Sequence, residues 1–403
     1  MRKKKFAVIG RGTAGAISMS QLLSRPDISA NAELEWYYDS KINPLAVGEG
    51  STLTLPSMLS RSIGFVHHEL DTIHGTFKNG IRKINWGEGT DFFHPFPPPG
   101  IGYHFNAVEL QKHIFERIKD QVKSIDGNIT ADQIDADYVI DCTGSPKNSD
   151  DIEIPKYIPV NAAYVTQCFW DYPRFQYTLT IARPYGWVFG IPLQNRCSIG
   201  YMFNDQITSL EEVKEDVKNI FDEFNLTPST TTNELHFKNY YRKTNFTSRL
   251  AYNGNASLFL EPIEATTLST VIQINNWAHK IIENPLLVNN TNSMYLDRLK
   301  NTERMIMFHY FAGSKFKTAF WDYAEERGRK CMEEAVADDN WMKKYEISKR
   351  MNFNETNGLL DELWKVRHRE GGGEDWSLWA YYVNLSSLGL NIYDKIDALK
   401  TNI

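Results

Sequence analysis

The segment from residue 6 to residue 40 constrains the fold of this chain more than any other. Residues 6–9 are apolar, and glycines follow at positions 10, 12 and 15. Residues 13–24 have a helical pattern, and "ELEWYYDS" (33–40) is a second strand-like run that ends on an acidic residue. The order strand, glycine turn, helix and strand predicts a βαβ unit.

The glycine spacing in this unit is typical of a dinucleotide site. One glycine permits a tight turn, one lets the backbone approach a pyrophosphate, and one packs the helix on the strand. The N-terminus of the helix then offers N–H groups to the phosphates. Asp39 follows the third glycine at roughly the 20-residue offset of a ribose-binding carboxylate. This pattern leaves FAD and NAD undistinguished, and the predicted cofactor contacts here are Gly10, Gly12, Thr13, Ala14, Gly15 and Asp39.

The rest of the chain indicates an α/β protein with a helical C-terminal part. Residues 104–122 have helical spacing, and "ADYVIDCTG" (136–144) is a strand that we expect to return to the first sheet. Segments between 157 and 205 alternate with Pro and Gly turns, which predicts an antiparallel sheet. Helical pattern dominates from about 268 onward and is interrupted by "GGGED" (371–375). We therefore expect a cofactor-binding core over 1–267, with the antiparallel sheet inserted at about 157–205, and a helical region over 268–403 that closes the substrate site.

Composition excludes several classes of function. The 403 residues carry a net charge of −6, so a nucleic-acid partner has no electrostatic support. No apolar stretch approaches a membrane span or a signal peptide. The four cysteines show no metal-ligand spacing, which favours reduced thiols in a cytoplasm, and no His/Glu constellation predicts a metal site. A homo-oligomer is allowed by the sequence, which does not determine the oligomeric state.

Four further motifs follow the glycine turn in a fixed order. They are "VGEGSTLTLPSML" (47–59), "GTFKNGIRKINW" (75–86), "GWVFGIP" (186–192) and "FLEPIEATTL" (259–268). Together with the glycine turn they resemble the flavin-dependent halogenases of the tryptophan halogenase family. The resemblance runs from residue 1 to about 270, with weaker echoes in "FHY" (308–310) and "FW" (320–321). It implies an FAD-binding fold of the glutathione-reductase or hydroxylase-like type, and the short chain is similar in length to phage-encoded members.

The resemblance also implies a two-component reaction centred on Lys78. A separate NAD(P)H-dependent flavin reductase would deliver FADH2, O2 would give a C4a-hydroperoxide, and halide would attack it to form hypohalous acid. Lys78 matches the lysine that presents this oxidant to an electron-rich aromatic such as an indole or phenol. An ammonium would hold the oxidant by a hydrogen bond, whereas a neutral amine, with its pKa lowered by burial, would form a haloamine. Without the resemblance, a lysine in these surroundings would be read as a surface residue.

The remaining site residues are carried over from the matching motifs. Glu264 corresponds to the carboxylate near the lysine, which stabilises the cationic ring intermediate and accepts its proton. A second interpretation, compatible with the first, is that Glu261 or Glu264 caps the helix that starts with "TTLSTVIQI". The resemblance also supplies a halide site and further cofactor contacts, which are the backbone at Thr266 and Thr267 for halide and Glu49, Gly50, Ser51 and Leu268 for the flavin.

Departures from the family pattern keep other functions open. The segment that keeps substrate from the flavin appears here as Trp187, Phe189, Ile191 and Pro192, with phenylalanine in place of a second tryptophan. A flavin monooxygenase that hydroxylates its substrate is therefore the nearest alternative, and a flavoprotein without catalysis is a third. The retained lysine and glutamate argue against the third.

Two smaller departures lie beside the predicted halide site. Ala265 stands where tryptophan-specific members have serine, and Thr267 stands where the family has glycine. The aromatic segment Glu374–Asn384, with Trp376 and Trp379 one helical turn apart, is a candidate part of the substrate lobe, with buried core as the alternative. The sequence does not indicate the substrate or the preferred halide.

Overall fold

The computed structural model describes residues 2–42, 48–89, 91–96, 100–352, 384, 388–389 and 391–400. Its N-terminal part is built on a five-stranded, fully parallel sheet in the order β17–β9–β1–β2–β8. The strands are β1 (Lys4–Ile9), β2 (Ala32–Tyr38), β8 (Lys123–Asp126), β9 (Tyr138–Asp141) and β17 (Leu250–Tyr252). The predicted βαβ unit is confirmed, and so is the return of the strand near residue 140 to the first sheet.

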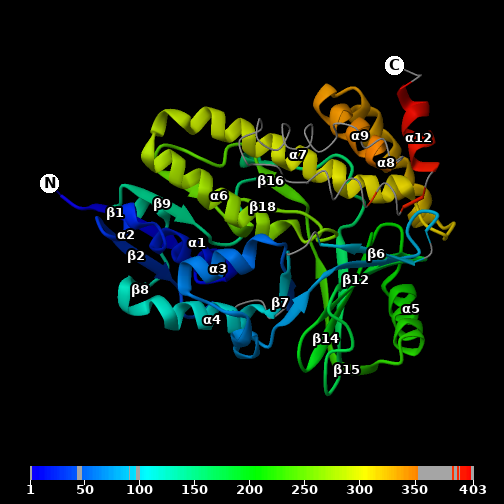
Figure 1. Ribbon diagram of the computed structural model, residues 1–403, viewed down its shortest axis with the longest axis horizontal. Coiled ribbons are helices and arrows are strands. Elements are labelled where there is room, and N and C mark those ends of the chain that lie inside the picture. Colours follow the sequence, from blue (N-terminus) through cyan, green and yellow to red (C-terminus); the bar gives the residue numbers. More distant parts are fainter. Residues whose placement is uncertain are drawn as a thin grey trace.

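The same N-terminal part of the chain contains four helices (Figure 1): α1 (Thr13–Leu23), α2 (Pro26–Ser29), α3 (Thr54–Ile63) and α4 (Ala107–Ile118). The predicted helix over 104–122 begins later than expected, because residues 104–106 belong to strand β7 (Gly102–Asn106). The side chain of Asn106 accepts hydrogen bonds from the N–H groups of Val108 and Glu109, which fixes the helix start.

A second, seven-stranded sheet has the order β15–β11–β14–β13–β12–β5–β6 and is antiparallel except where β5 and β12 pair in parallel. The predicted antiparallel segment supplies its centre, and strands from outside that segment extend both edges. One face is covered by α5 (Leu210–Glu223) (Figure 1). The strands are β5 (Gly80–Ile84), β6 (Asp91–Pro95), β11 (Ala162–Phe169), β12 (Thr178–Arg183), β13 (Gly186–Pro192), β14 (Arg196–Phe203) and β15 (Thr227–His236).

Two small sheets join these parts. One is β3–β7–β4, with β3 (Gly48–Gly50) and β4 (Thr76–Lys78) on either side of β7. The other is formed by β10 (Ile152–Glu153), β16 (Tyr240–Arg242) and β18 (Leu258–Phe259). Short 3-10 helices complete this part: η1 (His67–Ile73), η2 (Lys119–Gln121), η3 (Ala131–Gln133), η4 (Ser149–Asp151), η5 (Gly254–Ala256) and η6 (Pro285–Leu287).

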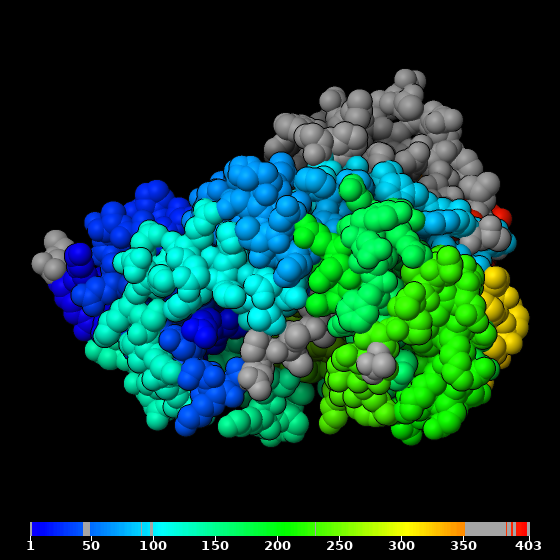
Figure 2. All heavy atoms as spheres, turned by 90° about the horizontal axis from the view of Figure 1, so that it is seen from below, coloured from blue at the N-terminus to red at the C-terminus, as the bar shows by residue number. Residues whose placement is uncertain are grey.

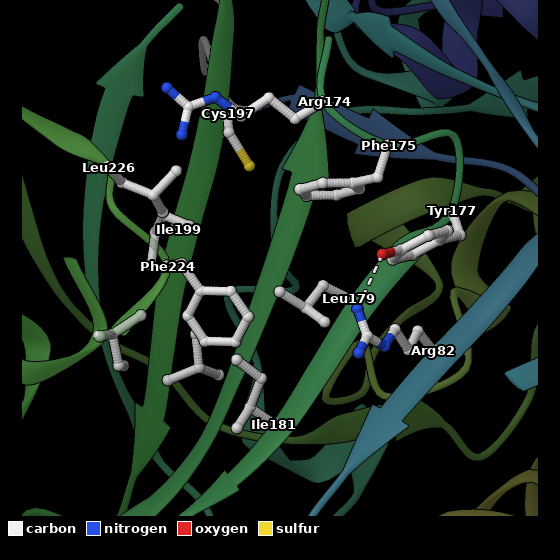
Figure 3. Close-up of a pocket in the computed structure, with 12 residues that line it drawn as sticks. Arg82, Arg174, Phe175, Tyr177, Leu179, Ile181, Cys197, Ile199, Phe224 and Leu226 are labelled. Atoms are coloured by element: carbon white, nitrogen blue, oxygen red, sulfur yellow. Dashed lines mark hydrogen bonds between the residues drawn. The ribbon is translucent and has the colours of Figure 1, made fainter. Parts of the chain in front are cut away.

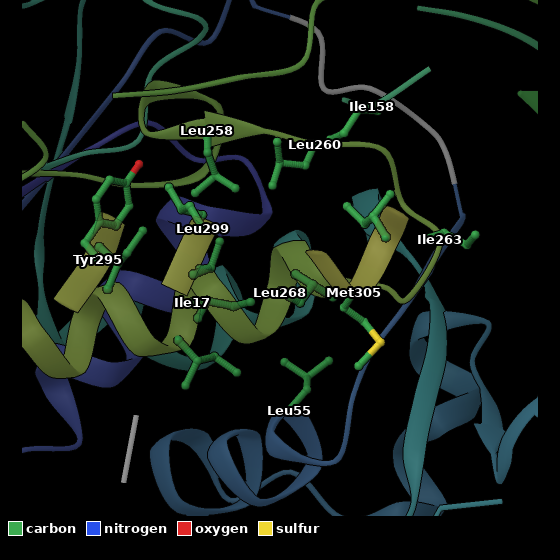
Figure 4. Close-up of a cluster of buried hydrophobic side chains, with 14 of the residues drawn as sticks. Ile17, Leu55, Ile158, Leu258, Leu260, Ile263, Leu268, Tyr295, Leu299 and Met305 are labelled. Atoms are coloured by element: carbon green, nitrogen blue, oxygen red, sulfur yellow. The ribbon is translucent and has the colours of Figure 1, made fainter. Parts of the chain in front are cut away.

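The described residues from 266 onward are mainly helical, as predicted from about 268. The helices are α6 (Thr266–Glu283), α7 (Val288–Ala312), α8 (Ala319–Val336), α9 (Asp339–Asn352) and α12 (Asn391–Lys400). Figure 4 shows how α6 packs: Ile17 of α1, Leu55 of α3, Leu268 of α6 and Leu299 and Met305 of α7 meet in one apolar cluster. The "GGGED" interruption lies outside the described residues, and the division at residue 267 stays a prediction.

The two faces of the seven-stranded sheet have different surroundings. On the face toward α5 lies a mainly apolar pocket (Figure 3), where Arg82 of β5 donates a hydrogen bond to the Tyr177 hydroxyl at 3.1 Å. The neighbouring Lys83 points to the opposite face. The pocket therefore lies across the sheet from Lys83. Among the helices described, none combines the length and hydropathy of a membrane span.

Candidate functional site

The three glycines of the turn have three different surroundings. Gly10 has φ +99°, and a Cβ there would lie 2.7 Å from the Cys142 carbonyl oxygen. A Cβ on Gly15 would lie 2.0 Å from the Gly10 carbonyl oxygen, so this glycine packs α1 on the turn. A Cβ on Gly12 would meet nothing within 4 Å. Gly12, at the start of α1, is thus the one that faces open space.

Other predicted cofactor residues converge on this end of the parallel sheet. The Thr13 hydroxyl donates to Glu49 of β3 at 2.9 Å and accepts from Gln111 at 3.1 Å. Burial raises the pKa of the Glu49 carboxyl to about 7. Asp39 directly follows β2, and Ala14 lies against Gly254. Carboxyl ends of parallel strands are where such folds bind ligands. Figure 2, seen from below, shows the surface hollowed beside the blue residues of this part.

Lys78 is buried on β4 beside the predicted flavin-contacting segment. Its side chain has no exposed surface, and its Nζ has no hydrogen-bond partner among the described residues. A Cβ on Gly50 would lie 3.6 Å from this Nζ, and the Phe96 ring centroid lies 5.5 Å from it. Next to Gly50, the buried Ser51 is tied to Tyr103 by two hydrogen bonds of 2.8 Å. Burial lowers the pKa of Lys78 to about 8, against the opposing charge of Glu264.

Glu264 is held in a buried polar cluster with residues that the sequence did not single out. Lys83 donates to the Glu264 carboxylate, to His309 Nε2 and, at 2.7 Å, to Asn384 Oδ1. His309 Nε2 also lies 2.9 Å from the Glu264 carboxylate. Although burial opposes ionisation, the charge of Lys83 holds the pKa of Glu264 well below its usual range. The geometry is that of a carboxylate paired with a buried ammonium.

The protonation of His309 follows from its second ring nitrogen. Nδ1 lies 2.8 Å from the carbonyl oxygen of Met305, which can only accept, so Nδ1 carries the hydrogen. Nε2 is then an acceptor for Lys83. Burial and the Lys83 charge lower the pKa of His309, which agrees with a neutral ring.

The start of α6 excludes the helix-capping alternative for the two glutamates. The N-cap is Ala265, with left-handed φ 53°, and no side chain caps the helix by a hydrogen bond. A non-glycine residue in this region is strained, which is typical of functional sites. Glu261 instead accepts from the Tyr310 hydroxyl at 3.0 Å, and burial raises its pKa to about 8. Thr266, the first residue of α6, has a buried hydroxyl without a partner among the described residues.

The predicted gating residues line the face of β13 that looks toward the lysines. Trp187, Phe189 and Ile191 pack into the main core, whereas Val188 faces α5. A Cβ on Gly200 of β14 would lie 2.0 Å from the Phe189 ring, so this ring occupies the space above the glycine. The motif ends at Pro192, whose carbonyl oxygen accepts from Thr76, two residues before Lys78, at 2.7 Å.

Comparison with known proteins decides the family. The family model for tryptophan halogenase matches residues 5–131 and 112–359. The chain belongs to the tryptophan halogenase family. Tryptophan 7-halogenase RebH of Lentzea aerocolonigenes is similar at 22% identity over 418 residues, which cover 79% of this chain and 78% of RebH.

Solved structures of tryptophan halogenases and other flavin-dependent halogenases share the fold. The tryptophan halogenase of Shewanella frigidimarina aligns with TM-score 0.74 at 16% identity, covering 99% of this chain and 94% of its own. Xcc4156, a flavin-dependent halogenase from Xanthomonas campestris, aligns with TM-score 0.71 at 19% identity, and the alignment covers 83% of this chain and 84% of Xcc4156. Its membership of the tryptophan halogenase family makes this chain an enzyme of the flavin-dependent halogenase class.

Three residues of this tryptophan halogenase family member were missed by the sequence reasoning. Lys83, His309 and Asn384 come from distant parts of the chain and meet only in the fold. The "FHY" echo (308–310) was a signal for His309, while Lys83 lay within the "GTFKNGIRKINW" motif (75–86) without an assigned role. Asn384 ends the predicted aromatic segment, whose residues 374–383 lie outside the described part of the chain.

One group of side chains in the described part of the chain has the composition of a metal site. Asp27 of α2 and His279 and Glu283 of α6 bring their ligand atoms within 4.8 Å of one another. The two carboxylates are exposed, and burial together with the charge of Arg25 lowers the pKa of His279. Nothing further points to an ion there, and the expectation of no metal stays a prediction.

Proposed function

We propose that this protein is an FADH2-dependent halogenase that halogenates an electron-rich aromatic, such as an indole or phenol, through Lys78. The observation that carries the proposal is the buried Lys78 amine, which has no hydrogen-bond partner among the described residues and lies within electrostatic reach of the ionised Glu264. O2, a halide ion and a separate NAD(P)H-dependent flavin reductase complete the reaction. The nearest alternative is hydroxylation of the substrate by the same flavin.

The residues at the glycine turn fit FAD. Gly12 leaves open space where a pyrophosphate would approach the N–H groups of α1, and Asp39, directly after β2, would accept a hydrogen bond from a ribose. Glu49 and Gly50 lie between this turn and Lys78, which suits a cofactor whose ring end points toward the lysine. When bound and reduced, FAD would supply the oxygen-activating chemistry that converts halide into hypohalous acid.

The chain's own residues then handle the oxidant. The neutral Lys78 amine attacks the halogen of hypohalous acid, forming an N–X bond and releasing water. The aromatic carbon next attacks the halogen, so that the C–X bond forms and the N–X bond breaks. The amine takes up one proton and the ring loses one, so the number of protons is unchanged. Glu264 stabilises the cationic ring and accepts its proton, for which even a weakly basic carboxylate is sufficient because the cation is strongly acidic.

The start of α6 is the proposed halide site. The backbone N–H groups of Thr266 and Thr267 lie in the first turn of an 18-residue helix, where a negative charge is favoured. The Cβ of Thr267 narrows this site relative to the family's glycine. Leu268, a proposed cofactor contact, is buried in the apolar cluster of Figure 4.

A bromide turnover screen tests the function directly. The protein is incubated with FAD, a flavin reductase, NADH, O2 and bromide, together with a panel of indoles and phenols, and products are read by mass spectrometry. A bromine isotope doublet is expected. A gain of one oxygen without bromine would establish the hydroxylase instead, and chloride and iodide in parallel would give the halide preference.

Gly12→Val is expected to abolish FAD binding while leaving the fold intact. Its side chain would fill the space in front of the helix N-terminus but would meet no protein atom at Cβ, so the stability cost is limited to about 1 kcal/mol for a poorer N-cap. FAD affinity is measured by fluorescence and stability by urea unfolding. Gly15→Ala is the matched control for a loss of stability. Its Cβ would clash with Gly10, so it is expected to destabilise the fold, unlike Gly12→Val. Tight FAD binding by Gly12→Val would contradict the assigned cradle.

The halogenation rate is expected to rise with pH through about 8 and then to level off. Lys78 is mostly an ammonium below its pKa of about 8 and mostly a neutral amine above it, and the neutral form attacks the oxidant. Product formation is measured at saturating reduced flavin, with the reductase rate followed separately. A rate that falls above this pH would show that the ammonium, as a hydrogen-bond donor, is the active form.

A further inference from the structure

Two buried lysines lie near Glu264 on consecutive strands, and their surroundings differ. Lys83 on β5 has three acceptors for the three N–H bonds of its ammonium: Glu264, His309 and Asn384. Lys78 on β4 has no hydrogen-bond partner among the described residues, although Glu264 is near enough to affect it electrostatically. One carboxylate is therefore shared unequally between two cationic side chains.

We propose that Lys83 is a positioning residue: it forms the ion pair with the Glu264 carboxylate and so leaves the Lys78 amine free to react. The proposal deepens the proposed function and rests on it for the role of Lys78. In this role Lys83 acts through Glu264 and needs no contact with substrate or cofactor.

The energetics of buried charges support this division. A buried carboxylate without a partner is strongly destabilising, so Glu264 must pair with one of the two lysines. Pairing with Lys78 would stabilise its ammonium form and occupy the atom that must meet the oxidant. Pairing with Lys83 satisfies the carboxylate elsewhere, and His309 and Asn384 take the other two hydrogens, so the ammonium has no reason to move.

The other titratable groups that face the cluster do not compete for the carboxylate. Burial lowers the pKa of His94 on β6 to about 4 and that of His104 on β7 well below its usual range, so both are neutral at pH 7. His104 lies between the hydroxyls of Thr76 and Thr178. Lys83 is thus the cation that sets the position and charge of Glu264.

Lys83→Met tests the proposal. Without Lys83, Glu264 is expected to turn to Lys78 and raise its pKa by at least about one unit, a tenfold shift in its protonation equilibrium. This is measured by NMR titration of ¹³C-lysine-labelled protein, with Lys78→Met used to assign the signal. Aromatic halogenation at pH 7 should fall at least about tenfold, while hypohalous acid formation, measured with a small-molecule scavenger, is unchanged.

The double variant Lys83→Met/Glu264→Gln separates positioning from a structural role. It removes both buried charges together, so it is expected to fold, and Lys78 has no carboxylate to pair with. Its Lys78 pKa should stay at or below the wild-type value. Arg82→Met removes a cation from the same strand on the opposite face and should leave the Lys78 pKa unchanged.

The outcomes separate this proposal from the proposed function. An unchanged Lys78 pKa in Lys83→Met, or a raised one in the double variant, overturns the role of Lys83. If Lys83→Met does not fold, Lys83→Gln takes its place with the same criterion. Absence of any halogenated product from the wild-type protein would overturn the proposed function, whereas the NMR titration does not depend on turnover.

Discussion

Replacing Lys78 by methionine is expected to abolish halogenation of the aromatic substrate while FAD binding survives. The loss should be at least about 1,000-fold, because the group that carries the oxidant to the ring is removed. Methionine fills a similar buried volume, and the lost amine made no hydrogen bond to the described residues, so the fold should tolerate the change. The measurement is product formation by mass spectrometry, with FAD affinity determined on the same preparation.

Escaped oxidant is the main complication in the Lys78→Met experiment. Hypohalous acid that leaves the protein can halogenate an activated ring in solution, so the assay includes a scavenger. With the scavenger present, wild-type protein should still give product and the variant should not. Equal rates for the two proteins under this condition would remove Lys78 from the mechanism.

The second large effect is on stability, and it differs between the two glutamates of the motif at 259–268. Glu264→Gln leaves the Lys83 ammonium buried without its counter-charge and is expected to cost about 3–5 kcal/mol of stability. Glu261→Gln should cost less than about 1 kcal/mol, because a carboxyl with a pKa of about 8 is already neutral at pH 7 and an amide can still accept from Tyr310. Urea unfolding measures both.

The halogenation rate should also differ between the two substitutions, and Glu264→Gln should again have the larger effect. Glu264→Gln is expected to slow the halogenation step without changing FAD affinity, whereas Glu261→Gln should leave the rate near that of wild type. Adding Lys83→Met to Glu264→Gln should recover stability, because both charges are then absent. Equal destabilisation by the two glutamine substitutions would contradict the assigned charges.

Local patterns were enough to predict the cofactor half of the fold. The turn at Gly10 needs a positive φ, and the packing at Gly15 excludes a Cβ, so both positions leave a signature in the sequence. The strand over 138–141 was recognisable from its apolar run. The start of the helix at Ala107 was not, because "HFN" fits a helical spacing until Asn106 is seen to cap it.

The charge cluster could not be predicted in the same way. Glu264 was found from its motif, but its partners Lys83, His309 and Asn384 are brought together by β5, α7 and a C-terminal residue. No spacing in the sequence connects these positions. The capping interpretation of the glutamates failed for the same reason, since it considered only the helix that follows them and not the strand opposite.

The alternation of side chains along β5 has a consequence for insertions and deletions. Arg82 faces the pocket beside α5, and Lys83 faces Glu264 on the other side of the sheet. A register slip of one residue along this strand exchanges the two faces, which in most sheets would place a misfit side chain in the core. A slip that brings Arg82 into the place of Lys83 replaces one cation by another, so Glu264 would still meet a positive charge, whereas the opposite slip would bring Ile84 there. A one-residue insertion or deletion that brings Arg82 to this position therefore keeps a counter-ion for the carboxylate.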